Sequence, residues 1–136
     1  MMRGQPPIGK NEVTEGGPSI FRVAFVEDDE SFRESLEGLL QAAGYEILSY
    51  PSAEAFLNSG DLHQVQCLIT DFGLPAMNGI DLLQAVHAVR AEVPVILVTA
   101  RPDPQILKQA LAAGASQVFT KPINSSALLE ALGPPK

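Results

Sequence analysis

Charged and hydroxyl side chains follow four apolar segments of this chain, and their combination points to cation chemistry. The segment FRVAFV meets four carboxylates in a row, Glu27 to Glu30, and the segment VQCLIT is followed by Asp71. The segment VPVILVT ends in Thr99, and SQVFT is followed by Lys121. Crowded carboxylates repel one another unless one of them holds a proton or the group binds a cation.

The carboxylates predict a metal site if the four segments are neighbouring strands of one sheet. The carboxyl ends of such strands bring together Glu27, Asp28, Asp71, Thr99 and Lys121. At ~4 Å and an effective dielectric constant of ~20, each like-charged pair costs about 4 kcal/mol. Oxygen ligands in a partly hydrated cleft suit a hard ion, above all Mg²⁺. Each residue alone has an ordinary explanation, such as a turn or a surface charge, so the prediction depends on the coincidence at four strand ends.

The predicted secondary structure alternates between strands and helices along the chain. Apolar runs predict strands over 21–26, 45–50, 65–70, 93–99 and 116–120. The spacing of apolar residues predicts helices over 31–44, 52–60, 79–90, 104–114 and 125–132. At the start of the first helix, Ser31 and Glu34 match a capping box, and the acidic Asp29 and Glu30 suit the helix dipole.

This alternation predicts an α/β fold with a parallel sheet. The strands at 65–70 and 93–99 are apolar almost throughout, which is typical of strands covered by helices on both faces. Right-handed crossovers then leave few topologies. Ligand chemistry in such folds collects beyond the carboxyl ends of the strands, where the charged residues stand.

Composition and charge narrow the class of protein further. The chain has 136 residues, 46% of them hydrophobic, which suits one domain with a substantial core. Its net charge of −7 argues against a protein that binds nucleic acid or an anionic membrane through charge. A lone Cys67 suits a reducing compartment, and no segment reaches the ~20 apolar residues of a membrane helix. We therefore expect a cytoplasmic protein. Residues 1–19, rich in Gly and Pro, are expected to form a flexible arm.

Four motifs together resemble the receiver domain of two-component response regulators. They are VEDD after the first strand, TDFGLPAMNGIDLL around Asp71, VTA after the fourth strand, and AAGASQVFTKP near the end. The resemblance covers about Phe21 to Leu132 and implies a flavodoxin-like, doubly wound (βα)5 fold with strand order 2-1-3-4-5. It gives a receiver domain over 20–133 with no output domain after it.

The resemblance also implies a role for each residue at the strand ends. Asp71 would accept a phosphoryl group from a phosphohistidine of a histidine kinase or phosphotransfer protein, and Thr99 and Lys121 would contact the phosphoryl oxygens. The implied Mg²⁺ ligands are Glu27, Asp28, Asp71 and the backbone carbonyl of Gly73. The bond before Pro122 is usually cis in this family.

A receiver domain implies a signalling switch that assists its own phosphoryl transfer and dephosphorylation, not a true enzyme. Phosphorylation would change the conformation presented to a downstream protein target or an output domain, without direct nucleic-acid binding. A homodimer through the fourth helix, fifth strand and last helix is the form of self-association that the resemblance suggests.

The sequence departs from the family at the usual aromatic switch position, which is Val118. Phe119 is adjacent, but successive strand residues point to opposite faces, so it should not substitute. The loop after Thr99 contains Pro102 and Pro104, which should make it stiff. Signalling is therefore expected to depend mainly on displacement of this loop and the fourth helix.

Two other functions stay open at this point. A receiver-like interaction module would keep the fold without phosphorylation. A Mg²⁺-dependent aspartyl-phosphate phosphatase of the haloacid-dehalogenase type is less favoured, because that class carries Asp-x-Asp after its first strand, whereas this chain has Asp71-Phe72-Gly73 on its third. A nucleotide or flavin binder is disfavoured, since its phosphate loop would not be lined with carboxylates.

Overall fold

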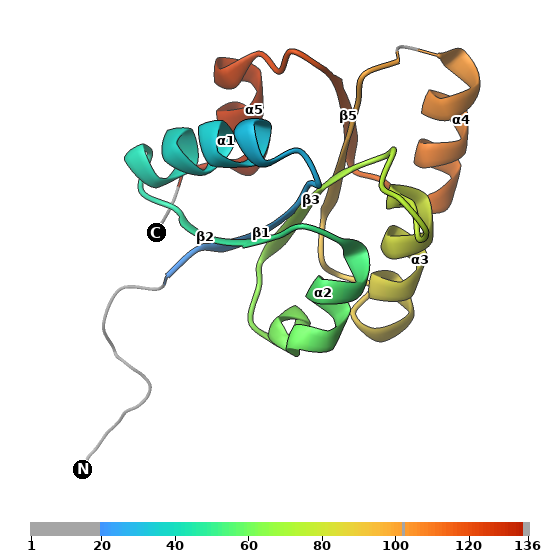
Figure 1. The fold of residues 1–136 in the computed structure, drawn as a ribbon, viewed down its shortest axis with the longest axis horizontal. Helices are drawn as coiled ribbons and strands as arrows, with labels where there is room; N and C mark the ends of the chain where they lie inside the picture. The colour runs from blue at the N-terminus through green and yellow to red at the C-terminus, as the bar shows by residue number, and fades with distance from the viewer. Residues whose placement is uncertain (1–19, 102, 135–136) are drawn as a thin grey trace.

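A computed structural model describes residues 20–101 and 103–134 (Figure 1). The predicted arm, residues 1–19, lies outside the described residues, as does Pro102. The strands are β1 Arg22–Val26, β2 Glu46–Tyr50, β3 Cys67–Asp71, β4 Val95–Thr99 and β5 Gln117–Thr120. The helices are α1 Glu30–Ala42, α2 Ala53–Ser59, the 3₁₀-helix η1 Asp61–His63, α3 Gly79–Val89, α4 Pro104–Ala113 and α5 Ser125–Leu132.

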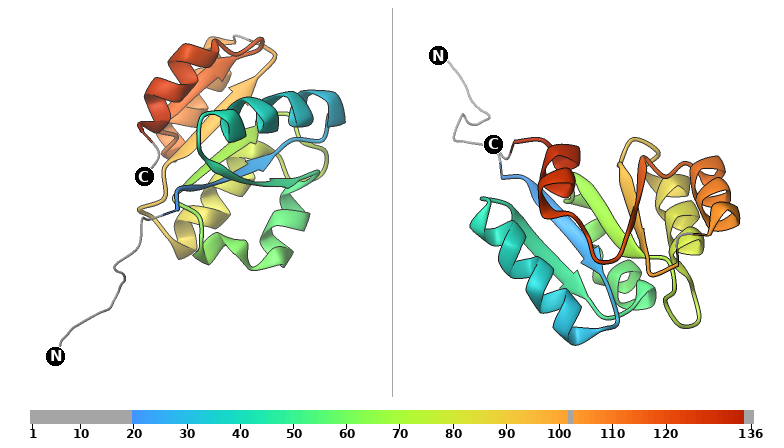
Figure 2. Two further views of the ribbon diagram at one scale, coloured as in Figure 1. Left: turned by 90° about the vertical axis from the view of Figure 1, so that its left-hand side faces the viewer. Right: turned by 90° about the horizontal axis from the view of Figure 1, so that it is seen from above.

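The five strands form one parallel sheet in the order β2-β1-β3-β4-β5, as predicted. Figures 1 and 2 show α1 and α5 on one face of the sheet, with α2, α3 and α4 on the other. Alternate strand residues point to the two faces: Val26 and Leu97 pack with the α2–α3–α4 layer, and Phe25 and Val98 with the α1–α5 layer. The fold is therefore the flavodoxin-like doubly wound arrangement.

Every residue of β3 and of β4 is buried, which explains why these segments read as continuous apolar runs. The strands nevertheless begin about two residues later than the sequence predicted, at Cys67 and Val95. Asp71 itself is the last residue of β3 and pairs with Val98 of β4. Within the described residues, no helix is both long and apolar enough to cross a membrane.

The predicted capping box at Ser31 and Glu34 is wrong. Helix α1 begins at Glu30, and its N-cap is Asp29, whose carboxylate accepts a 3.0 Å hydrogen bond from the N–H of Phe32. Asp29 has the extended backbone that an N-cap requires, so the helix begins before Ser31 can take that role. The prediction that Asp29 and Glu30 stand at the helix start is confirmed.

Candidate functional site

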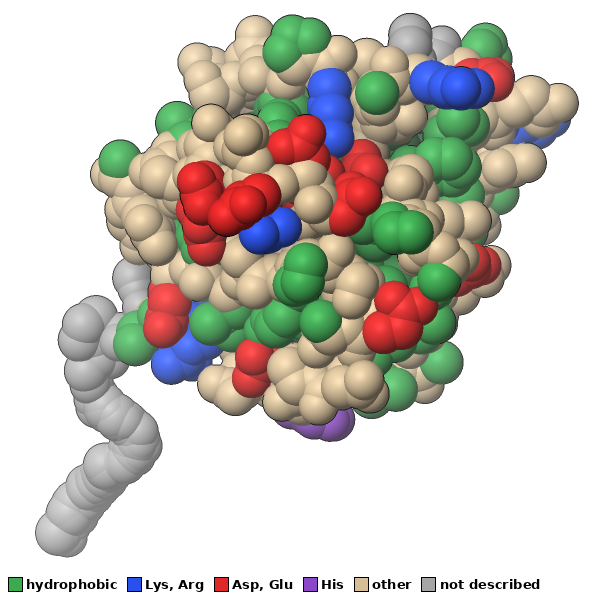
Figure 3. Space-filling model, viewed as in Figure 1, with side chains coloured by type: hydrophobic (Ala, Val, Ile, Leu, Met, Phe, Trp, Pro, Cys, Tyr) green, Lys and Arg blue, Asp and Glu red, His purple; other side chains and the backbone are tan. Residues whose placement is uncertain are grey.

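The predicted site residues lie together at the carboxyl edge of the sheet. Asp71 and Thr99 end β3 and β4, whereas Glu27 and Lys121 directly follow β1 and β5. Backbone hydrogen bonds between strands continue past the strand ends: the N–H of Lys121 donates to the carbonyl of Thr99 at 2.8 Å, and the N–H of Phe72 donates to the carbonyl of Val98 at 2.7 Å. In Figure 3, acidic side chains gather with basic ones over the region where α1 begins.

Glu27, Asp28 and Asp71 form a carboxylate cluster, in which one oxygen from each lies within 4.8 Å of the others. Glu27 is completely buried and Asp71 is 7% exposed, whereas Asp28 is exposed. Two buried carboxylates with a third open to solvent are a donor set of hard oxygens with an accessible side. This donor set fits Mg²⁺, which binds through a few carboxylates and keeps several of its waters.

Burial raises the pKa of both inner carboxyl groups. For Glu27 the charge of Asp71 raises the pKa further, while hydrogen bonds from the Asp29 N–H and from Lys121 oppose the rise. For Asp71, burial is again the largest cause, and the charge of Asp28 adds to it, against the opposing charge of Lys121. Both pKa values are raised in spite of Lys121, so one ammonium does not offset the buried negative charge. An additional cation would do so.

Lys121 bridges the two inner carboxylates. Its Nζ atom lies 3.0 Å from Oε1 of Glu27 and 3.4 Å from Oδ1 of Asp71, and 4.4 Å from the centre of the Phe32 ring. Partial burial works against the charged form, but the hydrogen bond to Glu27 and the charges of Asp71 and Glu27 outweigh it and raise the pKa of Lys121. The Lys121–Pro122 bond is cis, as the resemblance implied.

The hydroxyl of Thr99 is bonded to the loop that follows it. It accepts a hydrogen bond from the N–H of Arg101 at 3.0 Å and donates to the Arg101 carbonyl at 3.2 Å. Beside it is a cavity of about 410 Å³ whose lining includes Asp71, Gly73 and Lys121. Any group that pulls the Thr99 hydroxyl into this cavity must compete with its bonds to Arg101.

Asp71 is held in place by a tight connection from β3 to α3. The N–H of Gly79, the first residue of α3, donates to the carbonyl of Phe72 at 2.9 Å. Asn78 caps the helix and forms a capping box with Asp81. Gly73 lies on the side of the carboxylate: a Cβ added to it would stand 3.7 Å from Oδ2 of Asp71. The residue predicted to offer a metal ligand through its carbonyl thus lies beside the carboxylate cluster.

Val118 and Phe119 point to opposite faces of β5, as expected. Val118 packs with the α2–α3–α4 layer and Phe119 with the α1–α5 layer. A second cavity of about 220 Å³ lies between Val118 and Leu107 of α4, and it shares Thr99 and Arg101 with the first. The small valine therefore leaves open space directly behind Thr99.

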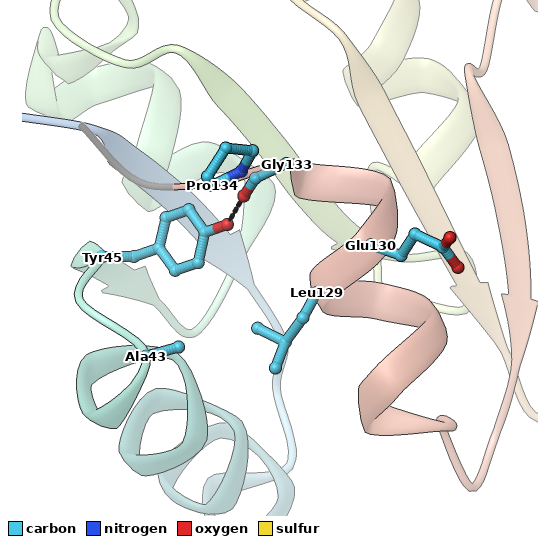
Figure 4. Close-up of a pocket in the computed structure, with 6 residues that line it drawn as sticks. All are labelled: Ala43, Tyr45, Leu129, Glu130, Gly133 and Pro134. Atoms are coloured by element: carbon cyan, nitrogen blue, oxygen red, sulfur yellow. Dashed lines mark hydrogen bonds between the residues drawn. The ribbon is translucent and has the colours of Figure 1, made fainter.

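Another cavity lies near the amino ends of the strands, far from the cluster of Glu27, Asp28 and Asp71. Figure 4 shows it between the end of α1 and the end of α5, with the Tyr45 hydroxyl donating to the carbonyl of Gly133. Its lining is mostly apolar, with Leu129 and Ala43 facing it. It contributes no side chain to the site.

Sequence reasoning missed three neighbours of the site. Phe32 lies in the predicted helix 31–44 and was given no role at the site, yet its ring contacts the ammonium of Lys121. Arg33 donates to the carbonyl of Glu27 at 2.7 Å, and Arg101 lines both cavities near Thr99. Phe32 and Arg33 stand on the first turn of the helix that follows the acidic residues. That placement is the only signal in the sequence that could have indicated them.

Comparison with known sequences places the chain in a family. The family model described as the response regulator receiver domain matches residues 23–133. The chain is 32% identical over 115 residues to the transcriptional regulatory protein FixJ of Azorhizobium caulinodans, covering 85% of this chain and 54% of FixJ. It is 32% identical over 110 residues to the response regulator protein TmoT of Ectopseudomonas mendocina, covering 81% and 48%. The chain thus spans about half the length of the curated relatives it matches.

Solved structures agree with this assignment. The chemotaxis protein CheY4 of Vibrio cholerae matches with a TM-score of 0.77 and 27% identity, covering 84% of this chain and 97% of CheY4. The BeF3-activated DrrB receiver domain matches with a TM-score of 0.78 and 26% identity, covering 84% and 95%. With five parallel strands in the matching order and a family model over most of its length, the chain belongs to the response regulator receiver domain family of two-component systems.

Proposed function

We propose that Asp71 is the phosphoacceptor of a phosphorylation-activated switch and that Lys121 and Thr99 serve the transfer. The observation that carries this proposal is the ammonium of Lys121, 3.4 Å from a carboxylate that is almost buried and that faces an open cavity. A lysine at this distance can neutralise the negative charge of Asp71, and it can also neutralise the charge of a phosphoryl group bound to Asp71. The chain is also similar to the DrrB receiver domain activated by BeF3. Because BeF3 has a shape like that of a phosphoryl group, this similarity supports the role of Asp71 as phosphoacceptor.

The transfer requires little chemistry beyond positioning and charge neutralisation. An oxygen of Asp71 forms a bond to the phosphorus of a phosphohistidine while the P–N bond breaks, and the imidazole leaves with the electron pair. The phosphohistidine belongs to a histidine kinase or a phosphotransfer protein. Lys121 turns toward the phosphoryl oxygens, and the Thr99 hydroxyl donates to them after leaving Arg101. The carboxylate is the nucleophile, so its ionised form is required.

Mg²⁺ completes the proposed site. Glu27, Asp28, Asp71 and the carbonyl of Gly73 would hold it. Bound there, the ion would supply positive charge to the carboxylates and to the phosphoryl oxygens. The protein is then a signalling domain that assists its own phosphorylation and dephosphorylation, and not an enzyme acting on a separate substrate.

The partners proposed for the phosphorylated form are a downstream protein or an output domain. They would bind the face formed by α4, β5 and α5, where Leu107 and Leu111 are 45% and 50% exposed. The same face would serve a homodimer. Apolar side chains at this exposure on one helix favour contact with another protein surface over contact with nucleic acid.

Phosphoryl uptake should depend on divalent cation. The protein is incubated with a small phosphodonor such as acetyl phosphate, with Mg²⁺ or with excess chelator, and its intact mass is recorded over time. We expect the gain of one phosphoryl group with Mg²⁺ and almost none with chelator, because the buried carboxylates repel an anionic donor. Full uptake in excess chelator would contradict the proposed metal requirement, and no uptake in either condition would contradict the function.

Signalling should involve the loop after Thr99 more than Val118. If the Thr99 hydroxyl moves to the phosphoryl group, its two bonds to Arg101 break, and the start of α4 loses an anchor. Valine has one stiff χ1 and no ring that could swing into the cavity behind Thr99. NMR of the free and phosphorylated forms should show the largest amide changes over 99–112, with small methyl shifts at Val118.

The control is Thr99→Val, which keeps the side-chain shape and removes the hydroxyl. Its amide changes over the same range should be much smaller at equal phosphorylation. Large methyl shifts at Val118, together with an unchanged α4, would overturn the idea.

A further inference from the structure

Three groups from three parts of the chain surround the ammonium of Lys121. Glu27 accepts a hydrogen bond from Nζ at 3.0 Å, Asp71 forms an ion pair with it at 3.4 Å, and the ring of Phe32 lies under it with its centre 4.4 Å away. A cation within ~6 Å of an aromatic centre and over the ring face is attracted by the ring quadrupole. Glu27 therefore holds the ammonium by a hydrogen bond and Asp71 holds it by charge, while the attraction to the ring face does not depend on the direction of an N–H bond.

Contacts other than the one with Lys121 fix the position of the Phe32 ring. The residue stands in the first turn of α1, where its N–H is bound to the Asp29 carboxylate at 3.0 Å. Its ring meets that of Phe25 edge to face, with centres 6.2 Å apart, and Phe25 is fully buried. The acidic N-cap and the core thus hold the ring in place next to the ammonium.

We propose that Phe32 is a positioning residue for phosphoryl transfer, which keeps the Lys121 ammonium over Asp71 while its hydrogen bonds change. This inference rests on the proposed function of Asp71. As the phosphoryl group reaches Asp71, the ammonium must turn from Glu27 to the new oxygens. During that turn the ring stays in contact, because attraction to its face tolerates rotation of the ammonium. The ring also covers one side of Lys121, whose side chain is 23% exposed, so that water competes less for the ammonium.

The test compares Phe32→Leu, which removes the ring and keeps an apolar side chain, with Phe32→Tyr, which keeps the ring. The rate of phosphoryl uptake is measured with acetyl phosphate and Mg²⁺. Because this donor is a small molecule, no contact between a kinase and α1 can affect the rate. We expect Phe32→Leu to be slower by about 3- to 10-fold, the range of a partly buried cation–π contact. Phe32→Tyr should stay within about 2-fold of the wild-type protein.

A double-mutant cycle separates positioning from a general effect on folding. In a Lys121→Met background there is no ammonium to position, so Phe32→Leu should cause no further loss. The same loss in both backgrounds, or a Phe32→Leu protein as fast as wild type, would overturn the proposal. Thermal melts of all four proteins verify that each is folded at the assay temperature.

An NMR measurement tests the contact without phosphorylation. In the wild-type protein, the ε-methylene protons of Lys121 should be shifted by the ring current of Phe32, and Phe32→Leu should abolish this shift. Absence of the shift in wild type would overturn the inference whatever the phosphorylation result. A wild-type protein that shows the shift but takes up no phosphoryl group would instead contradict the proposed function of Asp71.

Discussion

The Asp71→Asn protein should take up no phosphoryl group and should, without divalent cation, melt at a higher temperature than the wild-type protein. The first effect follows because an amide is not a nucleophile toward phosphorus under these conditions. The second follows because the carboxylate is almost buried and its pKa is raised by burial. Burial therefore makes the ionised form of Asp71 costly in the folded wild-type protein, and asparagine removes that cost at nearly constant volume.

The stability difference should depend on pH with a definite sign. Folding raises the pKa of Asp71 and of Glu27, so the folded protein binds protons more tightly than the unfolded chain. The stability that these groups contribute is complete below their ordinary values of 3.8 and 4.5, and it is lost as pH rises through the raised values of the folded state. The melting-temperature gap between Asp71→Asn and metal-free wild type should therefore widen from acid pH toward neutrality.

Calorimetry over this pH range, with intact-mass analysis of the same samples, decides both points. The matched control is Asp28→Asn, which removes a carboxylate of the cluster that is exposed, and it should change metal-free stability less. Mg²⁺ should raise the melting temperature of wild type more than that of either variant. A phosphorylated Asp71→Asn protein would contradict the assignment of the phosphoacceptor, and a gap independent of pH would contradict the electrostatic account.

The strand ends could be read from the sequence because parallel strands place all their carboxyl ends at one edge. That rule alone predicted that Lys121 would meet Glu27, although 94 positions separate them in the chain. The rule does not predict how deeply each of these side chains is buried. Glu27 and Asp28 are adjacent acids in the sequence, yet the first is fully buried and the second is exposed. Successive residues at a strand end turn to different sides, and it is the burial of the inner side chain that raises the pKa of Glu27.

Contacts between side chains of distant elements could not be read from the sequence. The Phe32 ring fits the helical spacing of a core residue, and nothing in that spacing distinguishes contact with Leu or Phe from contact with an ammonium. The bonds between Thr99 and Arg101 depend on the backbone path of one loop. The N-cap of α1 was placed wrongly because Asp29 and Ser31 are both good capping residues, and only the backbone path decides between them.

The turn from β3 into α3 leaves no space for a side chain at Gly79, so Gly79→Ala should strongly destabilise the protein. A Cβ there would stand 2.5 Å from the carbonyl oxygen of Asp71, 2.9 Å from the Cα of Phe72 and 2.7 Å from a methyl of Leu97. Two of these neighbours are backbone atoms at the end of a fully buried strand, which cannot give way cheaply.

We expect a loss of about 2–3 kcal/mol in the free energy of unfolding, the upper range for overpacking, and a melting temperature lower by roughly 10 °C. The matched control is Gly38→Ala in α1, where nothing lies within 4 Å of the new methyl group. That change should instead stabilise by about 0.5–1 kcal/mol, because alanine is the better helix former. Thermal and urea unfolding of both variants measure the two effects.

Since α3 can relieve the clash only by moving away from Asp71, Gly79→Ala should also slow phosphoryl uptake, whereas Gly38→Ala should leave the rate unchanged. Equal stability of the two variants would show that the start of α3 does not fix the backbone of Asp71.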